Sequence, residues 1–407
     1  MKYRNVTPRL LTAVSVVALA LSLAALIALC IAQRIPVADT LVYRVEGAAV
    51  ANGADPYGFT VTEWPLPATS PPFAAILFVP TTWLPVPALK VVFVAGNAIL
   101  LALLVRLSCR FAGLPARTPL VISAIAAGLW LEPVFQTLLV GQLNLALVCL
   151  VLWDLSRDKE AIGKGFALGV AAGVKPTAAV FIVHLLITGR VRAGLTALAS
   201  FTGTVLLGAL VLPHASAEFW TRRIFRTGRA GHAWTVENQS LQGLFARVLH
   251  TSEPGTAWAL AVALTAVAGL WTARRAAAEW GVLVTATTAL LVSPVSPSHH
   301  WVWCVPLLAV LIAEGRTRTA AVVAAVLVVR TLRLVPHRDS LDLQLPWWQQ
   351  PLASPYPLLG LALLAFAGWR TAPALTLPGP RGEYPRTDDL STSPEVPAGR
   401  PEVHCRP

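Results

Sequence analysis

The sequence predicts an all-α protein that crosses a membrane many times. Of its 407 residues 56% are hydrophobic and only 13% are charged, whereas soluble domains carry about 25% charge. The mean hydropathy is +0.65. Long apolar runs recur along most of the chain, separated by short loops in which Lys and Arg concentrate. This alternation is typical of a transmembrane helical bundle.

A helix needs about 20 apolar residues to cross the hydrocarbon core, although shorter and tilted helices are tolerated inside a bundle. The first apolar segment is too long for the core of a signal peptide, so we expect it to be a retained span. We predict about 12 crossings, within a range of about 10–13. The candidate spans lie near residues 9–32, 72–107, 118–133, 137–154, 162–174, 176–188, 193–212, 257–274, 278–292, 299–314, 317–335 and 352–369.

Proline and glycine interrupt two of these runs. Pro80, Pro85 and Pro87 break the 72–107 stretch, so its first part is expected to be a half-helix or re-entrant piece. Gly173 and Pro176 break the 162–188 stretch and predict a turn around Lys175.

The distribution of charge orients the bundle. With a cytoplasmic N-terminus, the basic loops fall inside, as the positive-inside rule requires. The exception is the loop 213–255, which carries five arginines, but long loops translocate largely regardless of charge. We therefore predict a multi-pass plasma-membrane domain over 1–371 with both termini in the cytoplasm. The remainder, 372–407, is rich in Pro, Ser and Thr and is predicted to be a disordered cytoplasmic tail.

The net charge of +12 fits basic cytoplasmic loops facing anionic lipid better than a nucleic-acid partner, which we do not expect. Five cysteines without a CxxC pair give neither a disulfide framework nor a metal knuckle.

The unusual polar residues all fall on the predicted outer side. Taken singly, each has a simpler interpretation as a solvated loop acid, a helix cap, an interhelical hydrogen bond or part of an interfacial aromatic belt. Together, a carboxylate, a lysine, two histidines and several amides would suit an anionic headgroup beside a hydroxyl. A lipid-linked phosphate is the natural ligand, because its tail needs the bundle. The residues concerned are Asp39, Tyr43, Gln142, Asn144, Lys175, Asn238, Gln239, His299, His300 and Trp301.

At these residues the chain resembles the polyprenol-phosphate-mannose-dependent mannosyltransferases of the GT-C superfamily, which act in actinobacterial cell envelopes. The resemblance spans about residues 35–305 and depends on an ordered set of motifs. These are Asp39 with Tyr43, Ser70-Pro71-Pro72-Phe73-Ala74-Ala75, Gly141-Gln142-Leu143-Asn144, Gly173-Val174-Lys175, Asn238-Gln239-Ser240, Ser293-Pro294 and His299-His300-Trp301-Val302-Trp303.

The resemblance implies a GT-C-type bundle, a polyprenyl-phosphate sugar donor, a glycolipid or lipoglycan acceptor, and an active site outside the cytoplasm. It implies inverting transfer with Asp39 as general base, and Lys175, His299 and His300 on the donor phosphate or sugar. Substrate contacts are expected from Tyr43, Gln142, Asn144, Asn238, Gln239 and Trp301. No cofactor is expected, and no metal, although Asp39 with Asp55 or Glu46 leaves a divalent cation open.

Three alternatives remain open at this level. One is a purely structural assembly protein, for which Asp39 would be dispensable. An arabinofuranosyltransferase using polyprenyl-phosphoryl arabinose would share the fold and differ in its sugar pocket. A lipid carrier or flippase without chemistry would place ionisable residues near the middle of the bilayer. Apart from Lys90, Arg330 and Arg333, the charges lie near the ends of spans, which favours an enzyme.

Overall fold

The structure is a computed structural model, and it describes residues 8–32, 37–58, 67–226, 232–336 and 339–372. Within these ranges the chain is mainly helical, with an isolated bridge between Asn238 and Pro297. The predicted all-α class is confirmed for this part of the chain. The predicted tail lies outside the described residues from 373 onward.

Four helices are long and apolar enough to cross a membrane: α1 (Pro8–Ala32), α4 (Val86–Phe111), α10 (Val191–Val211) and α13 (Gly255–Arg275). A fifth span would combine α5 (Thr118–Gly128) with α6 (Glu132–Val140), which meet at a bend of 68°. These helices make the chain a multi-pass membrane protein. The described helices do not establish twelve crossings, so that number stays a prediction.

Other apolar helices are shorter, and prolines or glycines account for several of the breaks. The 72–107 stretch is broken as predicted, into α3, η1 and α4 around Pro80 and Pro85, and the 162–188 stretch is broken at Lys175. The shorter elements of these and neighbouring regions are α3 (Pro72–Leu77), η1 (Val79–Trp83), α7 (Asn144–Leu155), α8 (Phe166–Val174), η2 (Pro176–Ala179), α9 (Val180–Ile187), α14 (Ala278–Val292), η5 (Ser298–Trp303), α15 (Cys304–Ala313), α16 (Thr317–Val329) and α18 (Pro355–Thr371).

Two segments expected to lie outside the membrane, between predicted spans, contain helices that the hydropathy pattern did not predict. The 33–71 segment forms α2 (Ala38–Ala51), and the 213–255 segment forms α11 (Pro213–Thr221), η3 (Arg223–Phe225) and α12 (Leu241–Val248). The remaining short elements are η6 (Thr331–Arg333), η7 (Asp339–Gln344) and α17 (Gln350–Ala353).

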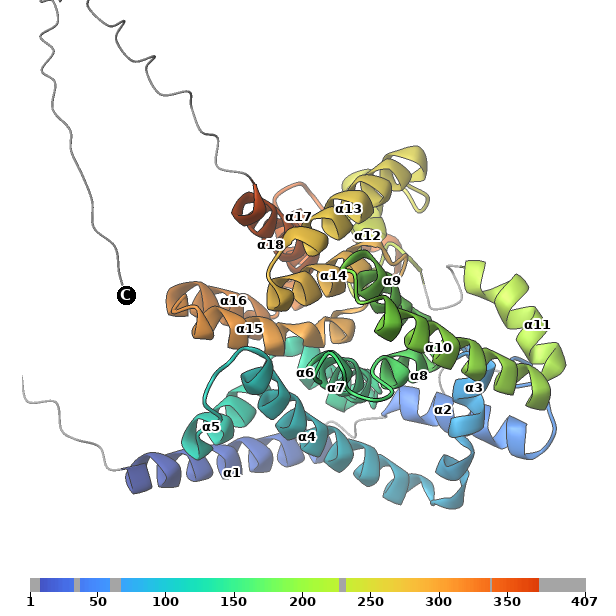
Figure 1. Cartoon of the computed structure of the whole chain (residues 1–407), viewed down its shortest axis with the longest axis horizontal. Helices are drawn as coiled ribbons and strands as arrows, with labels where there is room; N and C mark the ends of the chain where they lie inside the picture. Colours follow the sequence, from blue (N-terminus) through green and yellow to red (C-terminus); the bar gives the residue numbers. More distant parts are fainter. Residues whose placement is uncertain (1–7, 33–36, 59–66, 227–231, 337–338, 373–407) are drawn as a thin grey trace, which may run out of the picture. The chain divides into compact units, whose positions relative to one another are not determined.

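Glycines set the position of the site by letting α8 lie directly on α10 (Figure 1). A Cβ at Gly165, Gly169 or Gly173 would collide with Ala193, Ala197 or Thr204, respectively. This spacing of small residues every fourth position is the usual device for close packing of membrane helices. Because the contacts advance in the same direction along both helices, α8 and α10 run parallel. Lys175, which follows α8, therefore lies at the level of the last turns of α10.

Helix α2 is held against the rest of the bundle by its buried side. Arg44 donates to the carbonyl oxygens of Thr81 (2.6 Å) and Leu84 (2.5 Å), which fixes α2 on η1. Tyr43 stacks on Phe78 with ring centroids 4.4 Å apart. The buried Glu46 accepts the backbone N–H groups of Thr69 and Ser70, just before α3. These contacts give the first polar helix a fixed place beside the bundle.

Candidate functional site

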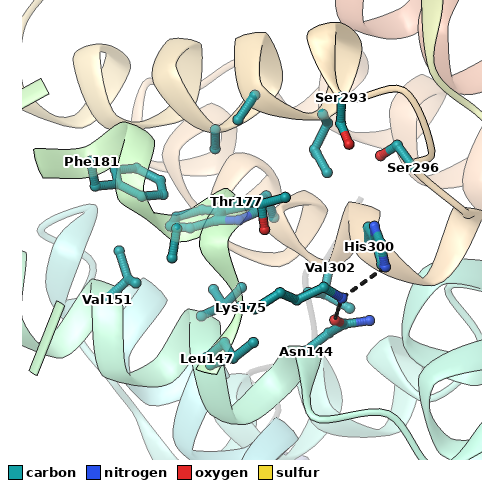
Figure 2. Close-up of a pocket in the computed structure, with 16 residues that line it drawn as sticks. Asn144, Leu147, Val151, Lys175, Thr177, Phe181, Ser293, Ser296, His300 and Val302 are labelled. Carbon is teal, nitrogen blue, oxygen red and sulfur yellow. Dashed lines mark hydrogen bonds between the residues drawn. The ribbon is translucent and has the colours of Figure 1, made fainter. Parts of the chain in front are cut away.

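Lys175 stands at the centre of a compact polar cluster (Figure 2). Its Nζ donates to Asn144 Oδ1 at 2.9 Å and lies 2.8 Å from His300 Nε2. An ammonium group can only donate, so His300 must accept through Nε2 and carry its proton on Nδ1. Two of the three Nζ hydrogens are therefore used by partners in the described part of the chain, and the third is available to a ligand.

The amide nitrogen of Asn144 fixes the turn that carries His299 and His300. Asn144 Nδ2 donates to the carbonyl oxygen of His299 at 2.8 Å, and Thr137 Oγ1 donates to the same oxygen at 3.2 Å. The His299 and His300 rings meet edge to face, with centroids 4.8 Å apart. His299 thus joins the cluster through its backbone and its neighbouring ring.

A second group of residues surrounds Asp39 in the first turn of α2. Gln142 Nε2 donates to Asp39 Oδ2 at 2.7 Å, and Tyr43 O–H donates to Gln142 Oε1 at 2.7 Å. Because an ionised carboxylate only accepts, the amide nitrogen of Gln142 must face Asp39 and its oxygen must face Tyr43. Burial and the charges of Asp39 and Glu46 raise the pKa of Tyr43 well above its ordinary value, so the phenol keeps its proton.

The backbone around Asp39 is strained. Val37, two residues before it, has φ 51°, which a β-branched residue rarely adopts. Gly141, with φ 74°, turns the chain out of α6 and lets Thr40 approach, since a Cβ at Gly141 would collide with the Thr40 hydroxyl. Such strain costs on the order of 1–3 kcal/mol and is commonest at functional sites.

The segment Gln142–Asn144 joins the two groups, since Gln142 holds Asp39 and Asn144 holds Lys175. The two charges are close enough to influence each other. Burial raises the pKa of the Asp39 carboxyl, while the Gln142 hydrogen bond and the Lys175 charge act to lower it. Burial lowers the pKa of Lys175 to about 8, against the opposing effect of Asp39. The site therefore contains a carboxylate ready to take a proton and a lysine that loses its charge easily.

A pocket extends from the Lys175 cluster (Figure 2), with about 570 Å³ of space not filled by atoms when the adjoining open solvent is included. Polar residues line one part of it, including Asn144, Lys175, Thr177, Ser293, Ser296 and His300. The rest of the wall is apolar and comes mainly from α7, α9 and α14, including Leu147, Val148, Val151, Phe181, Ala286 and Leu290. The buried Ser296 hydroxyl has no partner within the described residues. This pocket suits a ligand with an anionic head and an apolar tail.

A buried carboxylate supports the histidine turn from behind. Glu132, at the start of α6, is fully buried and accepts from Ser298 Oγ at 2.8 Å. Its other oxygen accepts from Tyr356 O–H at 2.5 Å. Ser298 immediately precedes His299, so this network connects α18 to the position of the site.

Three predicted substrate contacts lie outside the cluster. Asn238 is bonded to the carbonyls of Ala233 and Pro294 and to the N–H of Ser296. Gln239 donates to the carbonyls of Val236 and Ala353 and accepts from Tyr356 N–H. Trp301 is buried against Tyr356, with ring centroids 5.6 Å apart. Asn238 and Gln239 thus use their amides to hold the 293–297 segment and α18.

Of the ten predicted site residues, the structure brings seven together, namely Asp39, Tyr43, Gln142, Asn144, Lys175, His299 and His300. The prediction gave no role in the site to Ser296, Glu132 or Tyr356. The signal for Glu132 was present in the sequence, since an acid followed by Pro133 between apolar runs is unusual. Within the described residues, no three His, Cys, Asp or Glu side chains gather as a metal site would require.

Comparison with known proteins identifies the family of the chain. The chain is 33% identical over 369 residues to a polyprenol-phosphate-mannose-dependent alpha-(1-2)-phosphatidylinositol mannoside mannosyltransferase of Mycobacterium tuberculosis, covering 83% of this chain and 86% of that protein. A protein of the same name from Mycolicibacterium smegmatis is 31% identical, with 81% and 83% covered.

A polyprenol-phosphate-mannose-dependent alpha-(1-2)-phosphatidylinositol pentamannoside mannosyltransferase of Mycolicibacterium smegmatis is 34% identical over 257 residues, with 62% of each chain covered. No solved structure matches the chain. The sequence model of glycosyltransferase family 87 matches residues 69–294, more than half of the chain. The chain therefore belongs to glycosyltransferase family 87.

Proposed function

We propose that this glycosyltransferase moves a mannosyl residue from polyprenyl-phosphate mannose to a hydroxyl of a phosphatidylinositol-mannoside-type lipid on the extracytoplasmic face. The observation that carries the proposal is the joined arrangement of Asp39 and Lys175. A partly buried carboxylate and a partly buried lysine are attached to the two ends of one short segment, Gln142–Asn144. The names of the relatives support the donor and the class of acceptor.

In the proposed reaction, Asp39 takes the proton of the acceptor hydroxyl as its oxygen attacks C1 of the mannosyl group. The bond between C1 and the phosphate oxygen breaks, and polyprenyl phosphate leaves. A sugar hydroxyl is a weak nucleophile, so a positioned base is typically worth about 10²–10⁴ in rate. A single displacement inverts the configuration at C1, which fits a β-linked donor and an α-linked product.

Lys175 has the complementary role. The donor phosphodiester carries one negative charge, and the leaving phosphate monoester carries up to two. Negative charge therefore grows on the phosphate during the reaction, and a fixed cation in a water-poor site stabilises this change. The polar part of the pocket is lined by Lys175, the neutral His300 beside it and Ser296. One Nζ hydrogen of Lys175 and the Ser296 hydroxyl have no partner among the described residues. The apolar wall would receive the first isoprene units of the donor.

An assay with two donors tests the proposal. Purified chain in nanodiscs receives radiolabelled polyprenyl-phosphate mannose or polyprenyl-phosphoryl arabinose, together with a panel of phosphatidylinositol mannosides. We expect labelled mannolipid from the first donor only, and sensitivity of the product to an α-mannosidase. Transfer of arabinose instead would overturn the assignment of the sugar. Movement of the donor across the bilayer without any transfer would favour the flippase alternative.

A further inference from the structure

Helix α11 and the turn η3 that follows it lie where a membrane span ends. The candidate span α10 finishes at Val211, and only Leu212 separates it from the start of α11 at Pro213. The last turns of α10 present apolar side chains outward, with Leu210 82% exposed. Because a lipid-facing helix leads directly into α11, α11 begins at the boundary between hydrocarbon and headgroups.

This boundary is on the same side of the membrane as the site. Since α8 and α10 run parallel, Lys175 after α8 and α11 after α10 lie toward the same face. Gly208 near the end of α10 also packs against Pro72 and Phe73 of α3, which adjoins the Glu46 contact of α2. An interfacial surface on α11 would therefore neighbour the site.

One side of α11 is committed to packing. Phe219 is fully buried and stacks on Tyr57, with ring centroids 6.1 Å apart, and Ala215 joins the same small core. Arg223 is also occupied, because it pairs with Glu218 at 2.6 Å and its guanidinium lies 4.5 Å from the centre of the Tyr57 ring. These contacts fix the orientation of α11 and η3 on the first outer segment.

The other side presents charge together with an aromatic ring. Arg222 and Arg226 are exposed, and neither has an ion pair within the described part of the chain. Phe225 lies between them along the chain and is 75% exposed. An exposed aromatic ring flanked by unpaired guanidinium groups is poorly suited to bulk water. It matches the headgroup region, where the ring can enter the acyl boundary and the charges can meet phosphate.

We propose that Arg222, Phe225 and Arg226 form a binding surface for the phosphate of anionic phospholipids in the outer leaflet. Guanidinium groups bind phosphate oxygens through two parallel hydrogen bonds, which favours a phosphodiester that carries net negative charge over a zwitterionic headgroup. The surface also gives a role to two of the five arginines of the 213–255 segment, which opposes the general charge bias of the chain. It would concentrate anionic lipid beside the site independently of the chemistry performed there.

Photo-crosslinking tests this surface without any turnover. Phe225 is replaced by benzoylphenylalanine in the full chain, which is reconstituted in phosphatidylcholine vesicles containing 20 mol% (about one lipid in five) of phosphatidylglycerol. The two lipids are tagged in separate samples, and the crosslinking yields are compared. We expect the ratio of phosphatidylglycerol to phosphatidylcholine in the crosslinks to exceed their ratio in the bilayer by about fivefold for each arginine at low salt, and by much less at high salt.

Two variants identify the cause. Arg222→Gln with Arg226→Gln should abolish the enrichment, whereas Arg222→Lys with Arg226→Lys should retain most of it. The matched control, Arg110→Gln with Arg318→Gln, removes two exposed charges from other helices and should leave the enrichment unchanged. Equal labelling of both lipids by the parent protein, or enrichment that survives in the Gln pair, would overturn the proposal. Neither result bears on mannosyl transfer, which is measured separately.

Discussion

Replacing Asp39 by asparagine removes the proposed base with little change in shape. The amide that takes the place of the carboxylate can still accept the hydrogen bond from Gln142 through its oxygen, so the Tyr43–Gln142 arrangement has no reason to move. What is lost is the ability to take a proton, which is typically worth about 10²–10⁴ in rate. We expect turnover to fall at least about 100-fold, while the protein folds and inserts normally.

A second effect of Asp39→Asn passes through Lys175. The Asp39 charge raises the pKa of Lys175, which burial alone would lower further. Without this charge, Lys175 loses its proton at lower pH and donor binding weakens above neutrality. The measurement is therefore made at about pH 6.5, below the pKa of about 8 of Lys175, with purified enzyme in nanodiscs and radiolabelled polyprenyl-phosphate mannose. Single-turnover rates and equilibrium donor binding are recorded separately, and donor binding should persist.

Asp39→Glu distinguishes positioning from charge. The extra methylene displaces the carboxylate by about an ångström, and a misplacement of that size can cost about 100-fold. The alternative interpretation, a solvated loop carboxylate, predicts near-normal rates for both variants. An Asp39→Asn enzyme that keeps more than about a tenth of normal turnover would refute the general-base role.

Three further predictions concern the neighbours of Asp39. First, the pH profile of kcat/KM for the donor should be bell-shaped. Activity falls at low pH as Asp39 is protonated, and it falls at high pH as Lys175 loses its charge near 8. In Lys175→Arg the alkaline limb should move above about pH 10, since guanidinium stays charged there; an unchanged limb would exclude Lys175 as its origin. Second, Gln142→Leu removes a hydrogen bond that lowers the Asp39 pKa, so the acid limb should shift to higher pH. The control Tyr43→Phe should give a smaller shift, because Tyr43 only orients Gln142; equal profiles for wild type and Gln142→Leu would contradict this. Third, Asn238→Ala leaves the Ala233 carbonyl and the Ser296 N–H without their side-chain partner, each worth about 1–3 kcal/mol, while the Pro294 carbonyl keeps its bond from Ser240. Thermal unfolding in detergent should show a clear loss of stability, and a fully stable variant with only a raised KM would instead support direct substrate contact.

The sequence indicated much of this site because its residues interrupt apolar runs. Lys175 lies between Gly173 and Pro176, and His299 and His300 follow a proline-rich turn, so each is conspicuous where the chain is otherwise apolar. The pairings were not predictable, because they join distant positions. Lys175 and His300 are 125 residues apart, and Asp39 and Gln142 are 103 apart. Such contacts follow from packing of the whole bundle.

Helix α2 escaped prediction for a physical reason. Its inward side carries Asp39, Tyr43 and Glu46, which lie four and three residues apart and therefore share one face of a helix. A hydropathy pattern assigns such a polar face to water, whereas here it faces the protein. Asn238 and Gln239 show a related limit. Their side chains were expected to contact substrate, but in the structure they form hydrogen bonds with the backbone of the 293–297 segment and of the region before α18.

The charges of the proposed reaction balance within the site. Before transfer, Asp39 carries one negative charge, Lys175 one positive charge and the donor phosphodiester one negative charge. After transfer, Asp39 is neutral because it holds the proton, and the leaving phosphate carries the second negative charge. The total is unchanged, so no uncompensated charge has to form in a buried environment, which would be costly.

What changes is the location of the negative charge, which moves from Asp39 toward the phosphate. When Lys175 binds the phosphate, the charge moves toward an ammonium group that uses only two of its three hydrogens for partners among the described residues. The lowered pKa of Lys175 then has a function. Without a ligand the ammonium group is poorly solvated, so its attraction to the phosphate is greatest when the phosphate carries two negative charges. The partly buried, coupled pair therefore favours the transition state over the bound donor, and Asp39 must release its proton before the next cycle.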